Sequence, residues 1–456
     1  MLSLLDSTTR QPPPVTRALR ANLQSGHAEG AAFGAMVGMG ESYIPVFVLA
    51  VGLGELTAGL VSSVPLLAGG MLQLVSPFAV GRLGSYKRWV QICAAIQALS
   101  FVPFVYAALT QHISSVGVLL AASVYWGAGL ATGPAWNTWM EQLVPRSLRA
   151  GYFAQRTRYS QMAILLAFAG AGFALDWGAS HDRVLPVFAI LFAGAGILRS
   201  ISFLMLTRQN ETLAETIVPY SFANAFSELR GAGTGRLLTY LVVVQACVQF
   251  AGPFFAPYMI EQLHFSYVQF MYLISASFIL KVVMLPFYGR HVRRIGAERL
   301  LIWAGLGIAP VSALWLVSGH FGWLLVVQFA SGAAWAAYEL AFFLLFFEAI
   351  PKAKRTAVLT LYNLFNTAAW VAGALAGGLV LRTLGLTANS YLVLFALSSV
   401  GRLASLMILR RARLATVESA PIAVRTVGLR PSAASIDAVI LPALPDQAPE
   451  VEAAIS

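Results

Sequence analysis

Twelve apolar runs of about 20 residues follow one another along this chain, the length that a helix needs to cross a bilayer. Hydrophobic residues make up 58% of its 456 residues and charged residues only 11%, against roughly 25% in a soluble globular chain. So little charge cannot coat a soluble surface. The sequence therefore predicts an all-α membrane protein with spans at 29–52, 55–80, 89–110, 115–140, 157–178, 184–207, 237–259, 266–289, 298–318, 321–347, 357–382 and 389–410.

Motifs that recur in both halves of the chain indicate an internal duplication. Segment 77–84 (Pro-x-x-x-Gly-Arg-Leu-Gly) ends the second run, and segment 289–296 (Gly-x-x-x-Arg-Arg-Ile-Gly) ends the eighth, 212 residues later. Arg199 and Arg402, 203 residues apart, each open an Arg-x-x-Ser-x-x-x-Leu segment. In a membrane protein such halves usually pack as bundles around a central site. We therefore expect two pseudo-symmetric six-helix bundles, at 26–207 and 237–412.

The distribution of basic residues predicts the orientation in the membrane. Lys and Arg concentrate in the connections on one side, including Arg82, Arg88, Arg294 and Arg355, whereas the opposite connections hold Arg183. By the positive-inside rule both termini are then cytoplasmic. The net charge of +11 reflects this topology, so we expect no nucleic acid partner.

Three further segments complete the predicted organisation. They are a cytoplasmic arm at 1–25, a cytoplasmic linker loop at 208–236 and a tail at 413–456. The tail is rich in Ala, Pro, Ser and Val, a composition typical of disorder. The compact loops favour a bacterial inner membrane, and we expect a monomer.

With twelve spans, two halves, a central basic loop and cytoplasmic termini, residues 25–412 resemble the major facilitator superfamily. Its signature between spans two and three is Gly-x-x-x-Asp-Arg/Lys-x-Gly-Arg-Arg/Lys. A glycine and an arginine stand at the Asp position in the two copies here, so a charge contact that usually locks one conformation is in doubt. The resemblance implies four gating-loop residues: Arg82, Gly84, Arg294 and Gly296.

The same resemblance implies a function. It implies a secondary active transporter, a proton symporter by expectation, that moves a small organic solute by alternating access among membrane lipids. Span four lacks the Arg, and span five the Gly-Pro element, that drug exporters of the family tend to carry. No Walker-type loop, metal-ligand spacing or nucleophile–base set is evident in the sequence. We therefore expect no ATP use, metal, cofactor or enzymatic activity.

Two other interpretations stay open. One is a non-transporting member of the superfamily that acts as a sensor or as an assembly factor for pigments or lipids, which the missing Asp favours. The other is a lipid flippase or an embedded enzyme, favoured by the basic cluster of Arg156, Arg158 and Tyr159 at the start of span five. That cluster is also typical of a cytoplasmic gate or a contact with lipid headgroups.

Ionisable residues inside the spans are the first candidates for a site, because each costs at least about 2.5–3.5 kcal/mol at mid-helix by insertion scales. Glu41 lies roughly 20 Å above the cytoplasmic start of its span, at 1.5 Å per residue. Gly30, Gly34 and Gly38 precede it on the same face, and such a stripe lets another helix approach closely. Glu41 is either a substrate- or proton-binding carboxylate of the cavity or a hydrogen-bonded link to a neighbouring helix.

Lys281 and Glu339 form a second candidate. Both lie on spans that run from outside to inside, at matching depths. Pairing would offset much of the cost of burying either charge. Such a pair is either a static link within the C-terminal half or a coupling element that substrate or protons break.

The remaining candidates are polar and aromatic residues on spans expected to line a cavity. Amide and indole groups with flat apolar walls suit a moderately amphipathic organic ligand, although they also join helices in many membrane proteins. These residues are Asn137, Gln249, Asn363, Asn366 and Trp370. Arg199 and Arg402 are expected instead to snorkel to the headgroups from lipid-facing spans.

Overall fold

The computed structural model describes residues 17–211, 234–349 and 355–410. Within these ranges, twelve helices are long and apolar enough to cross a membrane, which confirms the predicted number. The first helix begins at Arg17, inside the range predicted as a polar arm. The predicted tail and most of the predicted linker lie outside the described residues.

The N-terminal half contains the first six spans. The first is built from three pieces and the next two from two pieces each. In chain order the elements are α1 (Arg17–Met39), the 3-10 turn η1 (Glu41–Tyr43), α2 (Ile44–Ala50), α3 (Glu55–Val61), α4 (Val64–Leu83), α5 (Tyr86–Leu99), α6 (Val102–Thr110), α7 (Ser115–Leu143), α8 (Arg146–Ser180) and α9 (Val184–Arg208).

The C-terminal half contains the other six spans. Its elements are α11 (Thr234–Ala251), the 3-10 turn η2 (Gly252–Phe254), α12 (Phe255–Pro257), the π-helical turn η3 (Tyr258–Gln262), α13 (Tyr267–Ile295), α14 (Ala297–Ile308), the 3-10 turn η4 (Ala313–Leu316), α15 (Phe321–Ala349), α16 (Arg355–Leu384) and α17 (Ala388–Arg410).

Both halves use the same helix pairs. In the N-terminal half α1 packs on α8 and α9, and α4 packs on α7; in the C-terminal half α11 packs on α16 and α17, and α13 packs on α15. The third spans match as well, since α5 contacts α7 and α9 as α14 contacts α15 and α17. The duplication visible in the sequence is therefore a duplication of packing.

Glycines set the contact between α1 and α8. A Cβ at Gly34 would lie 2.3 Å from the carbonyl oxygen of Ser160, and one at Gly38 would lie 2.3 Å from that of Ile164. Only hydrogen fits at such distances, so the two backbones touch directly. The predicted small-residue stripe is thus the surface on which α1 meets another helix.

The equivalent pair in the C-terminal half uses the same device with the roles exchanged. Here the glycines lie on the fifth helix of the half, α16, and face α11. A Cβ at Gly373 would lie 2.3 Å from the carbonyl oxygen of Ala246, and one at Gly377 would lie 2.0 Å from that of Phe250.

The first helix of each half is interrupted near its middle. In the first span the break is η1, preceded by Gly40 and followed by Pro45; in the seventh it is η2, which contains Pro253. A proline inside a helix removes a backbone hydrogen bond and bends the axis. Each break places side chains at the level where the halves meet.

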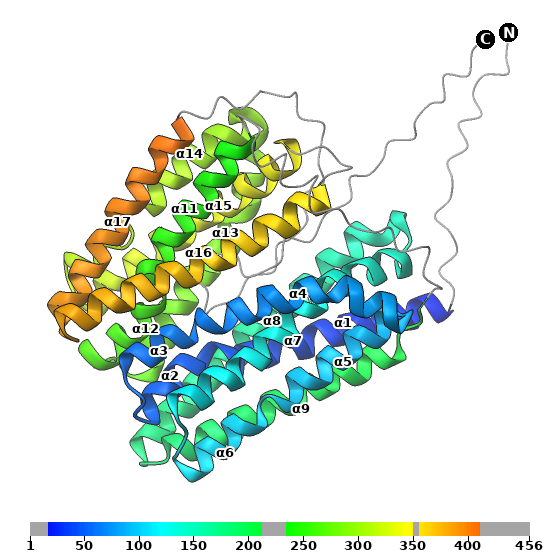
Figure 1. Ribbon diagram of the computed structural model, residues 1–456, viewed down its shortest axis with the longest axis horizontal. Coiled ribbons are helices and arrows are strands. Elements are labelled where there is room, and N and C mark those ends of the chain that lie inside the picture. Colours follow the sequence, from blue (N-terminus) through cyan, green and yellow to red (C-terminus); the bar gives the residue numbers. More distant parts are fainter. Residues whose placement is uncertain (1–16, 212–233, 350–354, 411–456) are drawn as a thin grey trace, which may run out of the picture.

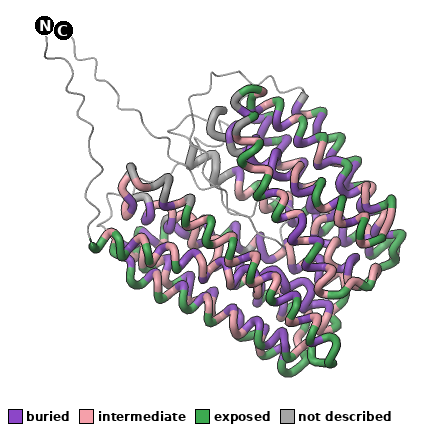
Figure 2. Tube along the Cα trace, turned by 180° about the vertical axis from the view of Figure 1, so that it is seen from behind, coloured by how far each residue is buried: buried purple, intermediate pink, exposed green. Residues whose placement is uncertain are grey.

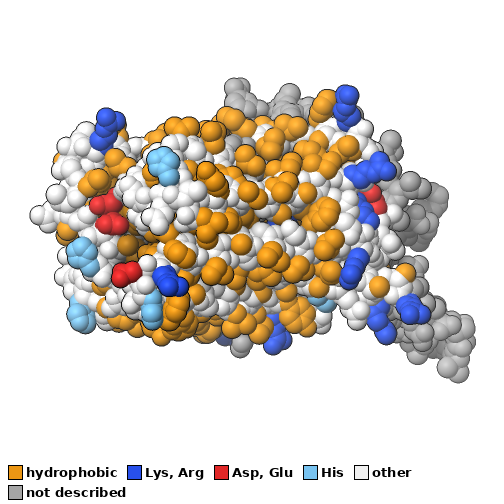
Figure 3. All heavy atoms as spheres, turned by 90° about the horizontal axis from the view of Figure 1, so that it is seen from below, with side chains coloured by type: hydrophobic (Ala, Val, Ile, Leu, Met, Phe, Trp, Pro, Cys, Tyr) orange, Lys and Arg blue, Asp and Glu red, His pale blue; other side chains and the backbone are white. Residues whose placement is uncertain are grey.

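The surface fits a lipid environment. Large apolar side chains such as Leu99, Leu166 and Val400 are exposed, and buried residues follow the faces where helices meet (Figure 2). Figure 3 shows an apolar band across the visible face, with most Lys and Arg side chains toward one end. We name this the basic end, and the end with the connections 51–54, 181–183 and 263–266 the opposite end.

The two halves meet near the opposite end and diverge toward the basic end (Figure 1). The ring of Phe270 lies 6.2 Å from that of Tyr43, and a Cβ at Gly59 would lie 2.3 Å from the ring of Phe254. Glu55 accepts hydrogen bonds from Gln262 (Nε2 to Oε1, 3.0 Å) and from the hydroxyl of Tyr391. All of these contacts join the N-terminal half to the C-terminal half.

The glycine contact between α1 and α8 predicts a large effect from a single methyl group. Gly38→Ala should lower the free energy of unfolding by about 1–3 kcal/mol, because backbone atoms must move apart. Gly170→Ala on α8 is the matched control, since no atom lies within 4 Å of its Cβ position. Thermal unfolding in detergent checks both; equal melting temperatures for the two variants would contradict the packing described.

Candidate functional site

A cavity of about 160 Å³ lies between the halves. One water needs roughly 10–15 Å³ by this measure, so the space holds on the order of ten waters or one small solute. The N-terminal half contributes 8 of its lining residues and the C-terminal half contributes 18. Its ionisable lining residues are Glu41, Lys281 and Arg402.

Glu41 occupies the break in the first span. It opens η1, is 3% exposed and lines the cavity. The hydroxyl of Tyr125 on α7 donates a hydrogen bond to its Oε2 (2.5 Å). The two interpretations from the sequence therefore meet here, because Glu41 both faces the cavity and joins the first span to the fourth.

Lys281 and Glu339 form an ion pair, which their matching depths allow. Nζ of Lys281 on α13 lies 2.5 Å from Oε1 of Glu339 on α15. Glu339 is completely buried, whereas Lys281 lines the cavity. The pair thus links a buried carboxylate to the cavity wall through an ammonium group.

Arg402 does not snorkel to the headgroups as expected. It is 3% exposed, lines the cavity and donates from Nη1 to the carbonyl oxygen of Ile308 on α14 (3.1 Å). Its helix, α17, packs between α11 and α14, and the side chain points inward from this position. The prediction was wrong because hydropathy gives the depth of a residue and not the direction that its side chain takes.

Arg199 is buried as well, inside the N-terminal half. It is 2% exposed, donates from Nη1 to Oγ of Ser202 (2.7 Å) and lies over the ring of Phe33. Ser202 in turn donates to Oε1 of Glu29 on α1 (3.3 Å). The expectation of snorkelling is therefore wrong for this arginine too.

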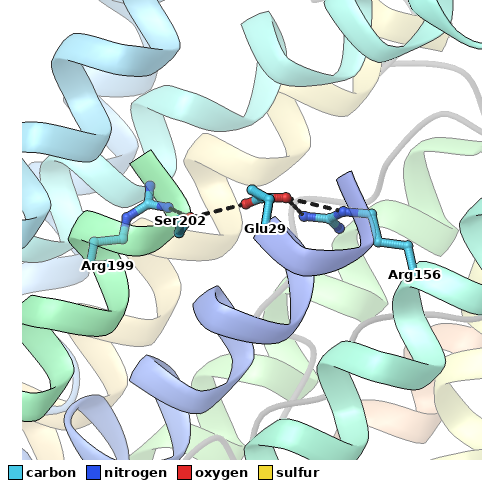
Figure 4. A network of polar contacts seen from close by, with 4 residues as sticks. All are labelled: Glu29, Arg156, Arg199 and Ser202. Atoms are coloured by element: carbon cyan, nitrogen blue, oxygen red, sulfur yellow. Dashed lines mark hydrogen bonds and ion pairs between the residues drawn. The ribbon is translucent and has the colours of Figure 1, made fainter. Parts of the chain in front are cut away.

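Glu29 is the centre of this buried polar network (Figure 4). Its other carboxylate oxygen pairs with Arg156 of α8, whose guanidinium also lies 4.3 Å above the ring of Trp136. Arg156, one of the residues of the predicted basic cluster, therefore binds Glu29 inside the N-terminal half. One carboxylate from α1 joins α8 and α9.

Two of the predicted polar residues lie at the cavity and three do not. Gln249 of α11 and Trp370 of α16 line it, each 5% exposed. The indole Nε1 of Trp370 has no hydrogen-bond partner among the described residues. Asn137, Asn363 and Asn366 lie outside the lining, nearer the basic end of their helices.

The predicted gating loops show a clear backbone role. Gly84 ends α4 with φ +62°, and Gly296 precedes α14 with φ +82°, both in the left-handed region that favours glycine. The side chains of Arg82 and Arg294 are exposed. Beside Gly84, Ser85 donates to Glu211 (2.5 Å), which ties this loop to the end of α9.

Several residues of the polar framework were not singled out from the sequence. Glu29 was visible as an acid at the start of an apolar run, Glu55 as an acid beginning the next, and Glu211 carried no signal. In the part of the chain that the structure describes, no group of three His, Cys, Asp or Glu residues is placed to hold a metal.

Comparisons with known proteins agree with this architecture. Residues 237–444 match the family model of the Major Facilitator Superfamily. A comparison with curated protein sequences gives no match.

Solved structures resemble the whole chain. The nucleoside transporter NupG is 14% identical with a TM-score of 0.63, covering 86% of this chain and 99% of its own. A D-xylose–proton symporter is 17% identical (TM-score 0.62; 86% and 97% covered). A bacterial homologue of the iron transporter ferroportin, in an inward-facing state, is 13% identical (TM-score 0.65; 87% and 99% covered).

The chain therefore has the fold of these membrane transporters, and it is an integral membrane protein. Its C-terminal half matches the model of the Major Facilitator Superfamily, and both halves together have the fold of the transporters that it resembles.

Proposed function

We propose that this protein is a secondary active transporter that moves a small organic solute by alternating access, coupled to protons. The observation that carries the proposal is a cavity lined by both halves, with Glu41, Lys281 and Arg402 in its wall, at the level where the first helices of the halves break. A site shared by two rocking bundles can face each side of a membrane in turn.

The contacts between the halves support one direction of opening. They cluster toward the opposite end, around Glu55 and the ring of Phe270, while the bundles diverge toward the basic end. We take the basic end as cytoplasmic by the positive-inside rule, with both termini on that side and a bacterial inner membrane as the location. The arrangement then corresponds to an inward-facing state, as in the similar ferroportin homologue.

The proposed coupling uses two carboxyl groups. Glu41 meets the cavity directly, and Glu339 meets it through Lys281. A proton on Glu339 would cancel its attraction for the ammonium group and free Lys281 for a solute. A proton on Glu41 would remove a negative charge from the cavity wall. In both cases a proton changes what the cavity can bind.

Loss of the two carboxyl groups should uncouple solute and proton movement. In proteoliposomes that contain a pH-sensitive dye, we expect addition of a transported organic acid, sugar or nucleoside to drive proton entry. Glu41→Gln together with Glu339→Gln should abolish that proton signal. Glu261→Gln, at an exposed acid that is not part of the cavity lining, is the control. Unchanged pH-driven transport in the double variant would refute proton coupling through these groups.

The ion pair predicts strongly non-additive stability. Lys281→Met or Glu339→Gln alone should cost about 3–5 kcal/mol, because each leaves an uncompensated buried charge. The double variant should cost much less than the sum of the two, since it leaves no charge behind. A double-mutant cycle from denaturant unfolding in mixed micelles measures this coupling. Additive effects of the two substitutions would show that the residues do not interact.

Glu55 should hold the opposite end closed. Glu55→Ala removes two hydrogen bonds between the halves, and a loss of about 1.4 kcal/mol shifts the open population tenfold. The readout is labelling of Ser62→Cys, a cavity residue, by an impermeant maleimide added at the opposite end. The background lacks Cys93 and Cys247.

The matched control for this experiment is Glu261→Ala. It removes an exposed acid at the same end, and no hydrogen bond of its side chain to the other half is present among the described residues. Labelling that rises equally in both variants would point to surface charge and not to a lock between the halves.

A further inference from the structure

Arg402 is a buried cation at the cavity wall with no acid beside it. Among the described residues it forms no ion pair, and its one protein partner is a backbone carbonyl oxygen. A buried charge without an opposite charge costs several kcal/mol. An anion bound in the cavity would neutralise this guanidinium group and offset that cost.

The other half of the protein shows how the same arginine is neutralised when no ligand is involved. Arg199, its counterpart, reaches Glu29 of the first helix through Ser202, as Figure 4 shows. Ser405 stands at the position equivalent to Ser202, but its hydroxyl donates to the backbone carbonyl oxygen of Arg402. The equivalent first helix, α11, contains no Asp or Glu. The duplicated halves differ in the acid and not in the arginine.

The two arginines also differ in their surroundings. Arg199 is absent from the lining of the cavity, whereas Arg402 lines it together with Lys281. The indole Nε1 of Trp370 and the amide of Gln249 add donors to the same wall. Six aromatic side chains also line the cavity: Trp126, Phe255, Phe270, Phe278, Trp315 and Trp335. A planar guanidinium group can donate two parallel hydrogen bonds to the two oxygens of a carboxylate or phosphate.

We propose that the solute is an amphipathic organic anion whose carboxylate or phosphate binds Arg402, with Lys281 as the second cation and its apolar body against the aromatic side chains. This inference rests on the proposed transport function and names the class of its substrate. The anion takes the place in the C-terminal half that Glu29 holds in the N-terminal half.

The test compares matched probes on the full-length protein in detergent. Benzoate, octanoate and 2-naphthoate are set against their amides at equal ionic strength, and 2-naphthyl phosphate is set against 2-naphthol. We expect the acids to raise the melting temperature and the amides to leave it unchanged. Carboxylates active without the phosphate ester, or the reverse, would identify which oxyanion the site takes.

Arg402→Gln should weaken binding of the active acids by at least about tenfold, the effect of losing one charge-assisted hydrogen bond. Arg199→Gln is the matched control, because it removes the equivalent arginine away from the cavity, and it should retain the wild-type affinity. If Arg402→Gln does not fold, the comparison of acids with amides on the unaltered protein still decides.

Three results would overturn the inference: equal stabilisation by acids and amides, no stabilisation by any acid up to 100 mM, or full acid affinity in Arg402→Gln. The proposed function fails separately. Flux of a neutral or cationic solute in proteoliposomes would sustain transport while refuting an anionic substrate. Acid binding through Arg402 without flux of any probe would sustain the anion site while refuting transport.

Discussion

A charge that leaves water for the interior of a bilayer needs a partner, and the choice of partners organises this molecule. In the N-terminal half, Glu29 satisfies Arg156 and, through Ser202, Arg199, so three helices are joined by one carboxylate. In the C-terminal half, Glu339 satisfies Lys281 and joins two more. The charges therefore act as fixed points within each bundle, while few charged contacts cross between them.

Between the bundles a different kind of contact operates. Aromatic rings, glycines and the hydrogen bonds of Glu55 meet at the opposite end, where they can separate without stranding a fully buried charge. Strong electrostatics inside each half and weaker contacts between halves suit rigid bodies that rock. The glycine contacts of α1 with α8 and of α16 with α11 lie within the halves and add to the rigidity of each bundle.

The fold could be predicted from the sequence because the membrane leaves few choices. Span number, the division into six and six, and the stripe of Gly34 and Gly38 all follow from hydropathy, repetition and helical spacing. Matching depth made a pair of Lys281 and Glu339 possible, and the structure shows that the two residues form it. The depth of a residue does not show which side of its helix the side chain faces. Arg402 was therefore expected at the lipid surface, although it points into the cavity. Asn137 and Asn363 were also expected at the cavity, but they lie nearer the basic end of their helices than the cavity does.

The unequal division of the cavity wall has a kinematic consequence. Most of the lining belongs to the C-terminal half, and the N-terminal half offers chiefly Glu41, Trp126 and apolar side chains. A bound solute would therefore keep its position relative to the C-terminal bundle throughout a transport cycle. The two halves, although built alike, would then have different roles: the C-terminal bundle would hold the solute, and the N-terminal bundle would move past it.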